Sequence, residues 1–216
     1  MTPKAVLFDC DGVIVDSEGM TFDLLAIDFA EHGLHLPVDT IARDFIGGTM
    51  TDVAHRARAA GADLPQDWVE RFYQRLYAHL AKGTPLIPGI LTVLDALDAA
   101  GIRYAMGSNG SDEKMQITLG QHPGLIARFR GHLYSGQTLG RPKPAPDLYL
   151  HAASRLGVST ADCVVVEDSP TGAQAARAAG MRCLGYAAHT PAERLAAVGA
   201  EPFFAMSDLP RLIGLR

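Results

Sequence analysis

The chain has 216 residues, of which 48% are apolar and 20% charged, and its formal net charge is −5. This composition is ordinary for a globular protein, and the length suffices for one large domain or one and a half. The acidic balance, without any basic block, argues against nucleic-acid binding, and the apolar runs are too short to cross a membrane.

The N-terminal residues Met1–Lys4 lead straight into a strand-like segment, so we expect no signal peptide. The chain has three widely spaced cysteines, an odd number: Cys10, Cys163 and Cys183. This pattern favours buried, reduced thiols in a cytoplasmic protein over a disulfide framework.

A short apolar run over residues 5–8 predicts the first strand, and Asp9 and Asp11 follow it directly. Since residues i and i+2 of an extended chain point to the same side, the two carboxylates can converge at the tip of this strand. Two anions held close together repel each other, so the site needs a compensating cation. The pattern therefore indicates a nucleophilic carboxylate, a neighbouring acid/base and a bound divalent metal.

After Asp16 the pattern is helical for about sixty residues. Apolar side chains at helical spacing, with glycines as end signals, predict four helices over residues 22–33, 38–45, 50–60 and 68–80. Because this block interrupts an otherwise mixed pattern, we expect residues 17–82 to form an inserted helical cap domain. Residues 1–16 and 83–216 are then the two parts of a discontinuous core domain.

From residue 83 onward, strand-like and helical segments alternate. The predicted strands cover residues 102–106, 133–134, 163–166, 182–186 and 202–205. The predicted helices cover residues 88–100, 147–156 and 170–180, the last with Ser169 as its N-cap and Pro170 as its first residue. Such alternation favours an α/β fold, a Rossmann-like doubly wound parallel sheet flanked by helices.

Polar residues stand where several predicted strands end, and ligands of open α/β sheets bind at that edge. Ser108 and Asn109 follow one strand, Glu167 and Asp168 follow another, and Lys143 lies in a proline-rich loop. Each feature alone has an ordinary explanation: a turn, a solvated lysine, or acidic residues that favour a helix N-terminus. The Asp-x-Asp-Gly segment could be a fragment of a calcium loop, but its glycine is at the wrong loop position. The order of all four features favours a catalytic site.

The same residues resemble the motifs of the haloacid dehalogenase (HAD) superfamily. These motifs are Asp-x-Asp-Gly-Val from Asp9, Ser-Asn at 108–109, Lys-Pro-x-Pro-Asp from Lys143, and Glu-Asp-Ser at 167–169 with Gly172 three residues on. The resemblance covers essentially the whole chain, with the helical insert where the family's first-type cap belongs. Within the superfamily the chain is similar to the sugar-phosphatase and β-phosphoglucomutase-like branch.

The resemblance implies roles for individual residues. Asp9 would attack phosphorus and form an aspartyl-phosphate, and Asp11 would protonate the leaving alcohol and then activate water. Ser108 and Lys143 would bind the transferring phosphoryl oxygens, and Asn109 would contact the substrate. Mg²⁺ would be held by four acidic residues: Asp9, Asp11 through its backbone carbonyl, Asp168 and, in support, Glu167.

Two residues of the helical block are candidate substrate contacts. Glu18 lies where the block begins, and hinge or plain loop polarity is an equal alternative for it. Thr49 follows Gly47-Gly48 in a segment that resembles the family's substrate-specificity loop, although a simple helix-breaking loop explains it as well.

The sequence therefore predicts a monomeric, cytoplasmic, Mg²⁺-dependent phosphatase acting on a small phosphorylated metabolite, a sugar or polyol phosphate. It predicts neither a nucleic-acid nor a membrane partner. A phosphomutase is the main alternative, but the His and Arg of the β-phosphoglucomutase pattern are replaced here by Thr21 and Met50. Two alternatives are weaker: a metal-free dehalogenase, which typically lacks the carboxylate of Asp11, and a phosphate-binding module without turnover.

Overall fold

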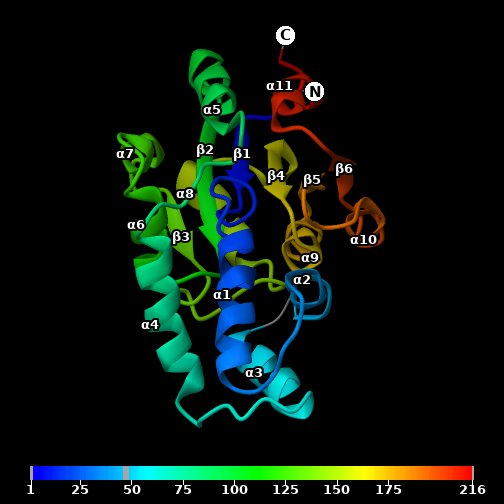
Figure 1. Ribbon diagram of the computed structural model, residues 1–216. Helices are drawn as coiled ribbons and strands as arrows, with labels where there is room; N and C mark the ends of the chain where they lie inside the picture. The colour runs from blue at the N-terminus through cyan, green and yellow to red at the C-terminus, as the bar shows by residue number, and fades with distance from the viewer. Residues whose placement is uncertain (1, 46–48, 216) are drawn as a thin grey trace. The chain divides into compact units, whose positions relative to one another are not determined.

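The computed structural model describes residues 2–45 and 49–215, and the chain divides into two compact units. One unit comprises the chain up to Asp16 and from Pro85 onward, and the other comprises Ser17–Thr84. The first unit contains all the strands of the described residues, and the second is built from helices (Figure 1).

A six-stranded parallel sheet forms the centre of the first unit, in the order β3-β2-β1-β4-β5-β6. Its strands are β1 Ala5–Phe8, β2 Arg103–Ser108, β3 Leu133–Ser135, β4 Cys163–Glu167, β5 Arg182–Tyr186 and β6 Glu201–Phe203. The predicted doubly wound parallel sheet is confirmed. Strand β1 is central, between β2 and β4, and the strand order reverses beside it. This switch point is where doubly wound sheets bind ligands, at the carboxyl ends of their strands.

Helices cover both faces of the sheet, which explains why the strands read as continuous apolar runs. Val6 and Phe8 of β1 face one apolar cluster, and Ala5 and Leu7 face the other. The first cluster is covered by α5 Ile90–Ala99, α6 Asp112–Leu119, α7 Leu125–Phe129 and α11 Leu209–Leu212. The second is covered by α8 Asp147–Leu156, α9 Pro170–Ala178 and α10 Ala192–Ala196.

The helical unit consists of α1 Glu18–Glu31, α2 Val38–Phe45, α3 Met50–Ala59 and α4 Trp68–Leu80. Its core is aromatic, because Trp68 stacks on both Phe29 and Phe72 with ring centroids 5.9 and 5.0 Å apart. A buried carboxylate, Asp28, accepts hydrogen bonds from Trp68 Nε1 and from Arg75 Nη1, each at 2.5 Å. The aromatic spacing over α4 thus predicted a packing face.

Most elements lie within a few residues of the predicted ones, but β2 extends to Ser108, which ends the strand instead of following it. Four short helices were not predicted: α6, α7, α10 and α11. Three of them have only four or five residues, too few for a helical period to be visible in the sequence. All three cysteines are buried and free. No helix in the described parts of the chain combines the length and apolarity needed to span a bilayer.

Candidate active site

Asp9 and Asp11 follow β1 at the carboxyl edge of the sheet. The backbone N–H of Asp9 donates to the Val166 carbonyl at 2.9 Å, which ties the end of β1 to β4. The turn continues through Gly12, whose φ of +77° lies in the left-handed region. A Cβ at this position would come within 2.0 Å of Asp168 Oδ2, so glycine permits the close approach of the two strand ends.

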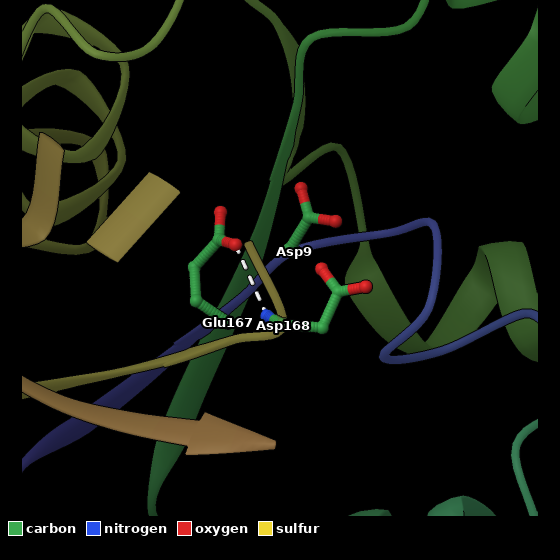
Figure 2. Close-up of side chains that lie close together, drawn as sticks. All are labelled: Asp9, Glu167 and Asp168. Carbon is green, nitrogen blue, oxygen red and sulfur yellow. Dashed lines mark hydrogen bonds between the residues drawn. The ribbon is translucent and has the colours of Figure 1, made fainter. Parts of the chain in front are cut away.

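Glu167 ends β4 and Asp168 follows it, beside Asp9. Carboxylate oxygens of Asp9, Glu167 and Asp168 lie within 4.8 Å of one another, and all three side chains are buried (Figure 2). Glu167 is held in place by Tyr149, whose hydroxyl donates to Oε1 at 2.8 Å, and by Ser169, whose Oγ donates to Oε2 at 2.9 Å. The sheet therefore brings three of the four predicted metal ligands together in one place.

Lys143 contacts two carboxylates of this acidic cluster. Its Nζ donates to Glu167 Oε1 at 2.6 Å and also to Asp9, and its side chain is 3% exposed. Burial alone would lower the pKa of Lys143, but Asp9 and Glu167 more than offset that effect and raise it. The lysine is therefore a fixed positive charge that touches two carboxylates.

Ser108 and Asn109 come from the end of β2. Ser108 Oγ lies 3.5 Å from Asp11 Oδ2 and accepts a hydrogen bond from the Gly110 N–H at 2.9 Å. The side chain of Asn109 spans the backbone of Lys143: Oδ1 accepts from its N–H at 2.8 Å and Nδ2 donates to its carbonyl at 3.1 Å. This geometry indicates that Asn109 positions the lysine loop, and its direct contact with a substrate stays a prediction.

A second lysine, Lys114, was not identified from the sequence. Its Nζ lies 2.8 Å from Asp11 Oδ1, and only 16% of its side chain is exposed. Lys114 lies in the first turn of α6, where Ser111 caps the helix by accepting the Lys114 N–H at 3.1 Å. The serine cap just after the end of β2 is a signal that could have placed this lysine at the same edge of the sheet.

The acidic residues at this edge outnumber the basic ones. Burial raises the pKa of Asp9 to about 7, and the charges of Glu167 and Asp11 add to this effect while Lys143 opposes it. Four carboxylates, those of Asp9, Asp11, Glu167 and Asp168, face two lysines, which leaves a deficit of two positive charges. The donors are all oxygen atoms, so the cluster fits a hard divalent cation in both charge and ligand type.

Glu18 and Thr49 belong to the helical unit, and their contact with a substrate stays a prediction. Glu18 is the first residue of α1. Thr49 caps α3: its Oγ1 accepts the Asp52 N–H at 3.2 Å, while its own N–H donates to Asp52 Oδ2 at 2.8 Å. The preceding glycines, Gly47 and Gly48, lie outside the described residues.

Comparison with known proteins places this arrangement in context. The model of the haloacid dehalogenase-like hydrolase family matches residues 3–180. The 6-phosphogluconate phosphatase of Escherichia coli (strain K12) is 30% identical over 97% of this chain and 94% of its own length. SUPPRESSOR OF QUENCHING 1, a chloroplastic protein of Arabidopsis thaliana, is 35% identical over 84% of this chain, but the match spans only 17% of that protein.

A solved structure agrees with these sequence matches. A HAD family hydrolase from Deinococcus radiodurans R1, with bound phosphate and sodium, superposes with a TM-score of 0.82 at 36% identity. The superposition covers 97% of this chain and 94% of that one.

Proposed function

This chain belongs to the haloacid dehalogenase-like hydrolases and is a phosphoric monoester hydrolase, and we propose that it cleaves a small sugar or polyol phosphate through an aspartyl-phosphate. The observation that supports this most is the convergence of Asp9, Asp11 and Lys143 at the carboxyl edge of one sheet. Phosphoryl transfer depends mainly on positioning and charge neutralisation, and this edge offers both.

In the first half of the proposed reaction, a carboxylate oxygen of Asp9 forms a bond to phosphorus as the bond from phosphorus to the leaving oxygen breaks. Asp11 gives its proton to that oxygen, so the product leaves as an alcohol. In the second half, Asp11 takes a proton from water, the water oxygen bonds to phosphorus, and the bond to Asp9 breaks. Inorganic phosphate and the free carboxylate of Asp9 result.

Two further groups would hold the phosphoryl oxygens in both halves. Lys143 is already fixed beside Asp9 by the bonds from Asn109 to its backbone, so binding requires little reorganisation of its loop. Ser108 presents its hydroxyl next to Asp11. Both donors lie where negative charge is held during transfer.

The acidic cluster would hold Mg²⁺ through Asp9, Asp168 and the backbone carbonyl of Asp11, with Glu167 in support. A bound divalent cation supplies charge neutralisation for the phosphoryl oxygens and orients them. Mg²⁺ is favoured by the oxygen-only donor set and by the deficit of two positive charges.

A sugar or polyol phosphate is proposed because the similar Escherichia coli enzyme is named for 6-phosphogluconate and covers nearly the same length. Phosphoglycolate is an alternative substrate. In this proposal Ser17–Thr84 acts as a cap that contacts the leaving group, with Glu18 and Thr49 as candidate contacts. Hydrolysis is proposed over mutase activity, because Thr21 donates its hydroxyl to the Ser17 carbonyl at 2.8 Å and cannot serve as a cationic group.

The test is phosphate release from a panel of phosphorylated metabolites, with Mg²⁺ and with excess EDTA. Asp9→Asn should abolish turnover, and Asp208→Asn, the same change at the other end of the chain, should not. Residual activity of Asp9→Asn within about tenfold of wild type would remove Asp9 from the nucleophile role. Full activity in EDTA would contradict the metal dependence.

The route of the water can be followed separately. In a single turnover in ¹⁸O-labelled water, the label should appear in inorganic phosphate, because water attacks phosphorus. Label in the carboxylate of Asp9 would instead indicate attack on its carbonyl carbon, as in the dehalogenase alternative. Faster formation of a phosphate isomer than of inorganic phosphate would favour the mutase.

A further inference from the structure

We propose that the core unit has a second binding site, an arginine-lined cleft that takes a small anion carrying more than one phosphate group. The cleft has a volume of about 740 Å³. It lies where α5, α7 and α8 end and β2 begins, and four arginines line it: Arg103, Arg128, Arg130 and Arg155. The proposal is independent of the proposed function.

This cleft is separate from the carboxylate cluster. Arg103 opens β2 and Ser108 closes it, so the two sites lie at opposite edges of the sheet. At the usual rise per residue the ends of this strand are about 16 Å apart. All lining residues belong to the first unit, so the cleft needs nothing from the helical one.

Two of the four arginines form hydrogen bonds or ion pairs that stabilise the fold. Arg103 Nη1 donates to the carbonyl of Leu156 at the end of α8, at 2.6 Å. Arg128 bridges Asp95 and Asp98 of α5, each at 2.7 Å. Cations at helix C-termini are stabilising in their own right, so these two alone would not indicate a ligand. The Nε of Arg128, however, is buried without a hydrogen-bond partner among residues 2–45 and 49–215.

The inference rests on the other two arginines, Arg130 and Arg155. The side chains of Arg130 and Arg155 are exposed and form no hydrogen bond or ion pair with any residue that the structure describes. With Arg128 offset by Asp95 and Asp98, the cleft keeps a surplus of two positive charges in a chain whose net charge is −5. A local surplus of this kind concentrates anions.

The backbone at Arg130 adds an independent observation. Its φ is +46°, and it is the one non-glycine with a positive φ in the described parts of the chain. This backbone conformation favours glycine over arginine, and such strain at a non-glycine residue concentrates at ligand sites. The residue is the C-cap of α7 and lines the cleft.

The chemistry of the lining identifies the class of ligand. Guanidinium groups match phosphate oxygens in a bidentate fork, better than any other side chain. The arginines come from three separate elements around a cleft of about 740 Å³, so an anion with two or more phosphates can contact more of them than an anion with one. A volume of about 740 Å³ is that of a small-molecule site, and Ile102 and Phe129 give the cleft an apolar floor.

The test is a titration of the protein with methylenediphosphonate in the absence of Mg²⁺, monitored by ¹H–¹⁵N NMR. A phosphatase cannot cleave the P–C–P bridge of this compound. Amides of residues 128–132 and 155–157 should shift and saturate, with a binding curve separate from any shift near Ser108. Arg130→Gln and Arg155→Gln should each weaken binding at the cleft by about tenfold, the loss of one charged contact. Arg194→Gln, an exposed arginine on α10, is the matched control and should change nothing.

Three results would overturn the proposal. One is no saturable shift of the cleft amides at millimolar methylenediphosphonate. Another is equal weakening by Arg194→Gln, which would indicate a general charge effect. The third is equal affinity for tricarballylate, a small tricarboxylate, which would remove the preference for phosphate.

Discussion

Gly172→Ala should damage the active site although it replaces no catalytic side chain. Gly172 lies in the first turn of α9, against the carboxylate of Glu167. An added Cβ would lie 1.6 Å from Glu167 Oε1 and 1.9 Å from its Cδ. An ordinary contact needs about 3.5 Å, so the carboxylate must move by roughly 2 Å.

The size of the effect follows from the hydrogen bonds that Glu167 accepts. Its Oε1 accepts from Lys143 at 2.6 Å and from Tyr149 at 2.8 Å, and the residue is 0% exposed. A movement of this size breaks both bonds and leaves a buried lysine partly uncompensated, which costs about 3 to 5 kcal/mol. For a chain of this length that corresponds to a fall in melting temperature of roughly 10 °C. Misplacement of Lys143 by about 1 Å should lower kcat about a hundredfold.

The measurement is thermal unfolding together with kcat on an aryl phosphate, at a temperature where the variant is folded. Gly19→Ala is the matched control, because a Cβ at this helical glycine meets nothing within 4 Å. A Gly172→Ala variant that melts within about 2 °C of wild type, with kcat unchanged, would refute the argument. It would mean that neither bond to Glu167 Oε1 holds the site together.

Three other outcomes are expected. Lys114→Met should lower kcat roughly tenfold with little change in KM, because Asp11 loses the ammonium that fixes its carboxylate, and Lys114→Arg should restore part of the rate. Because the folded-state pKa of Asp9 is about 7, above its ordinary 3.8, the metal-free protein should lose stability as pH rises from about 4 to about 7. Millimolar Mg²⁺ should therefore raise the melting temperature more at about pH 8 than at about pH 5, and the reverse order would contradict this assignment. Asp28→Ala should destabilise the helical unit by about 1 to 3 kcal/mol, because the buried Trp68 Nε1 loses its hydrogen-bond acceptor while Arg75 keeps Glu31 as a partner, and a loss under about 0.5 kcal/mol in urea unfolding would exclude that role.

The sequence predicted the strand ends of the site well, because the signals there are local. The apolar runs before Asp9 and Glu167 are bounded by acidic residues, and in a parallel sheet all such ends meet at one edge. The serine cap of α9 is also local: Ser169 accepts the Gly172 N–H at 3.1 Å, as its position before a proline predicted. Local pattern and fold agree at these positions.

What the sequence did not predict depends on contacts between distant segments. The ion pair of Lys114 with Asp11 joins α6 to the loop after β1, and the hydroxyl of Tyr149 reaches Glu167 from α8. The serine cap of α6 could place Lys114 at this edge of the sheet, but it does not identify Asp11 as its partner, and no local signal connects Tyr149 with Glu167. The arginine cleft is of the same kind, because it forms only when three helix ends meet at the start of β2.

The energetics of the buried charges explain why the site has this composition. An apolar group of similar volume in place of a buried ion pair is often neutral or stabilising, so Lys143 between Asp9 and Glu167 is weak evidence for stability. The sheet nevertheless tolerates these charges, because Tyr149, Ser169 and the backbone satisfy the oxygens of Glu167. One carboxylate remains in excess for each lysine, and burial already raises the pKa of Asp9. A core arranged for stability alone would not keep that imbalance, whereas a bound divalent cation would offset it.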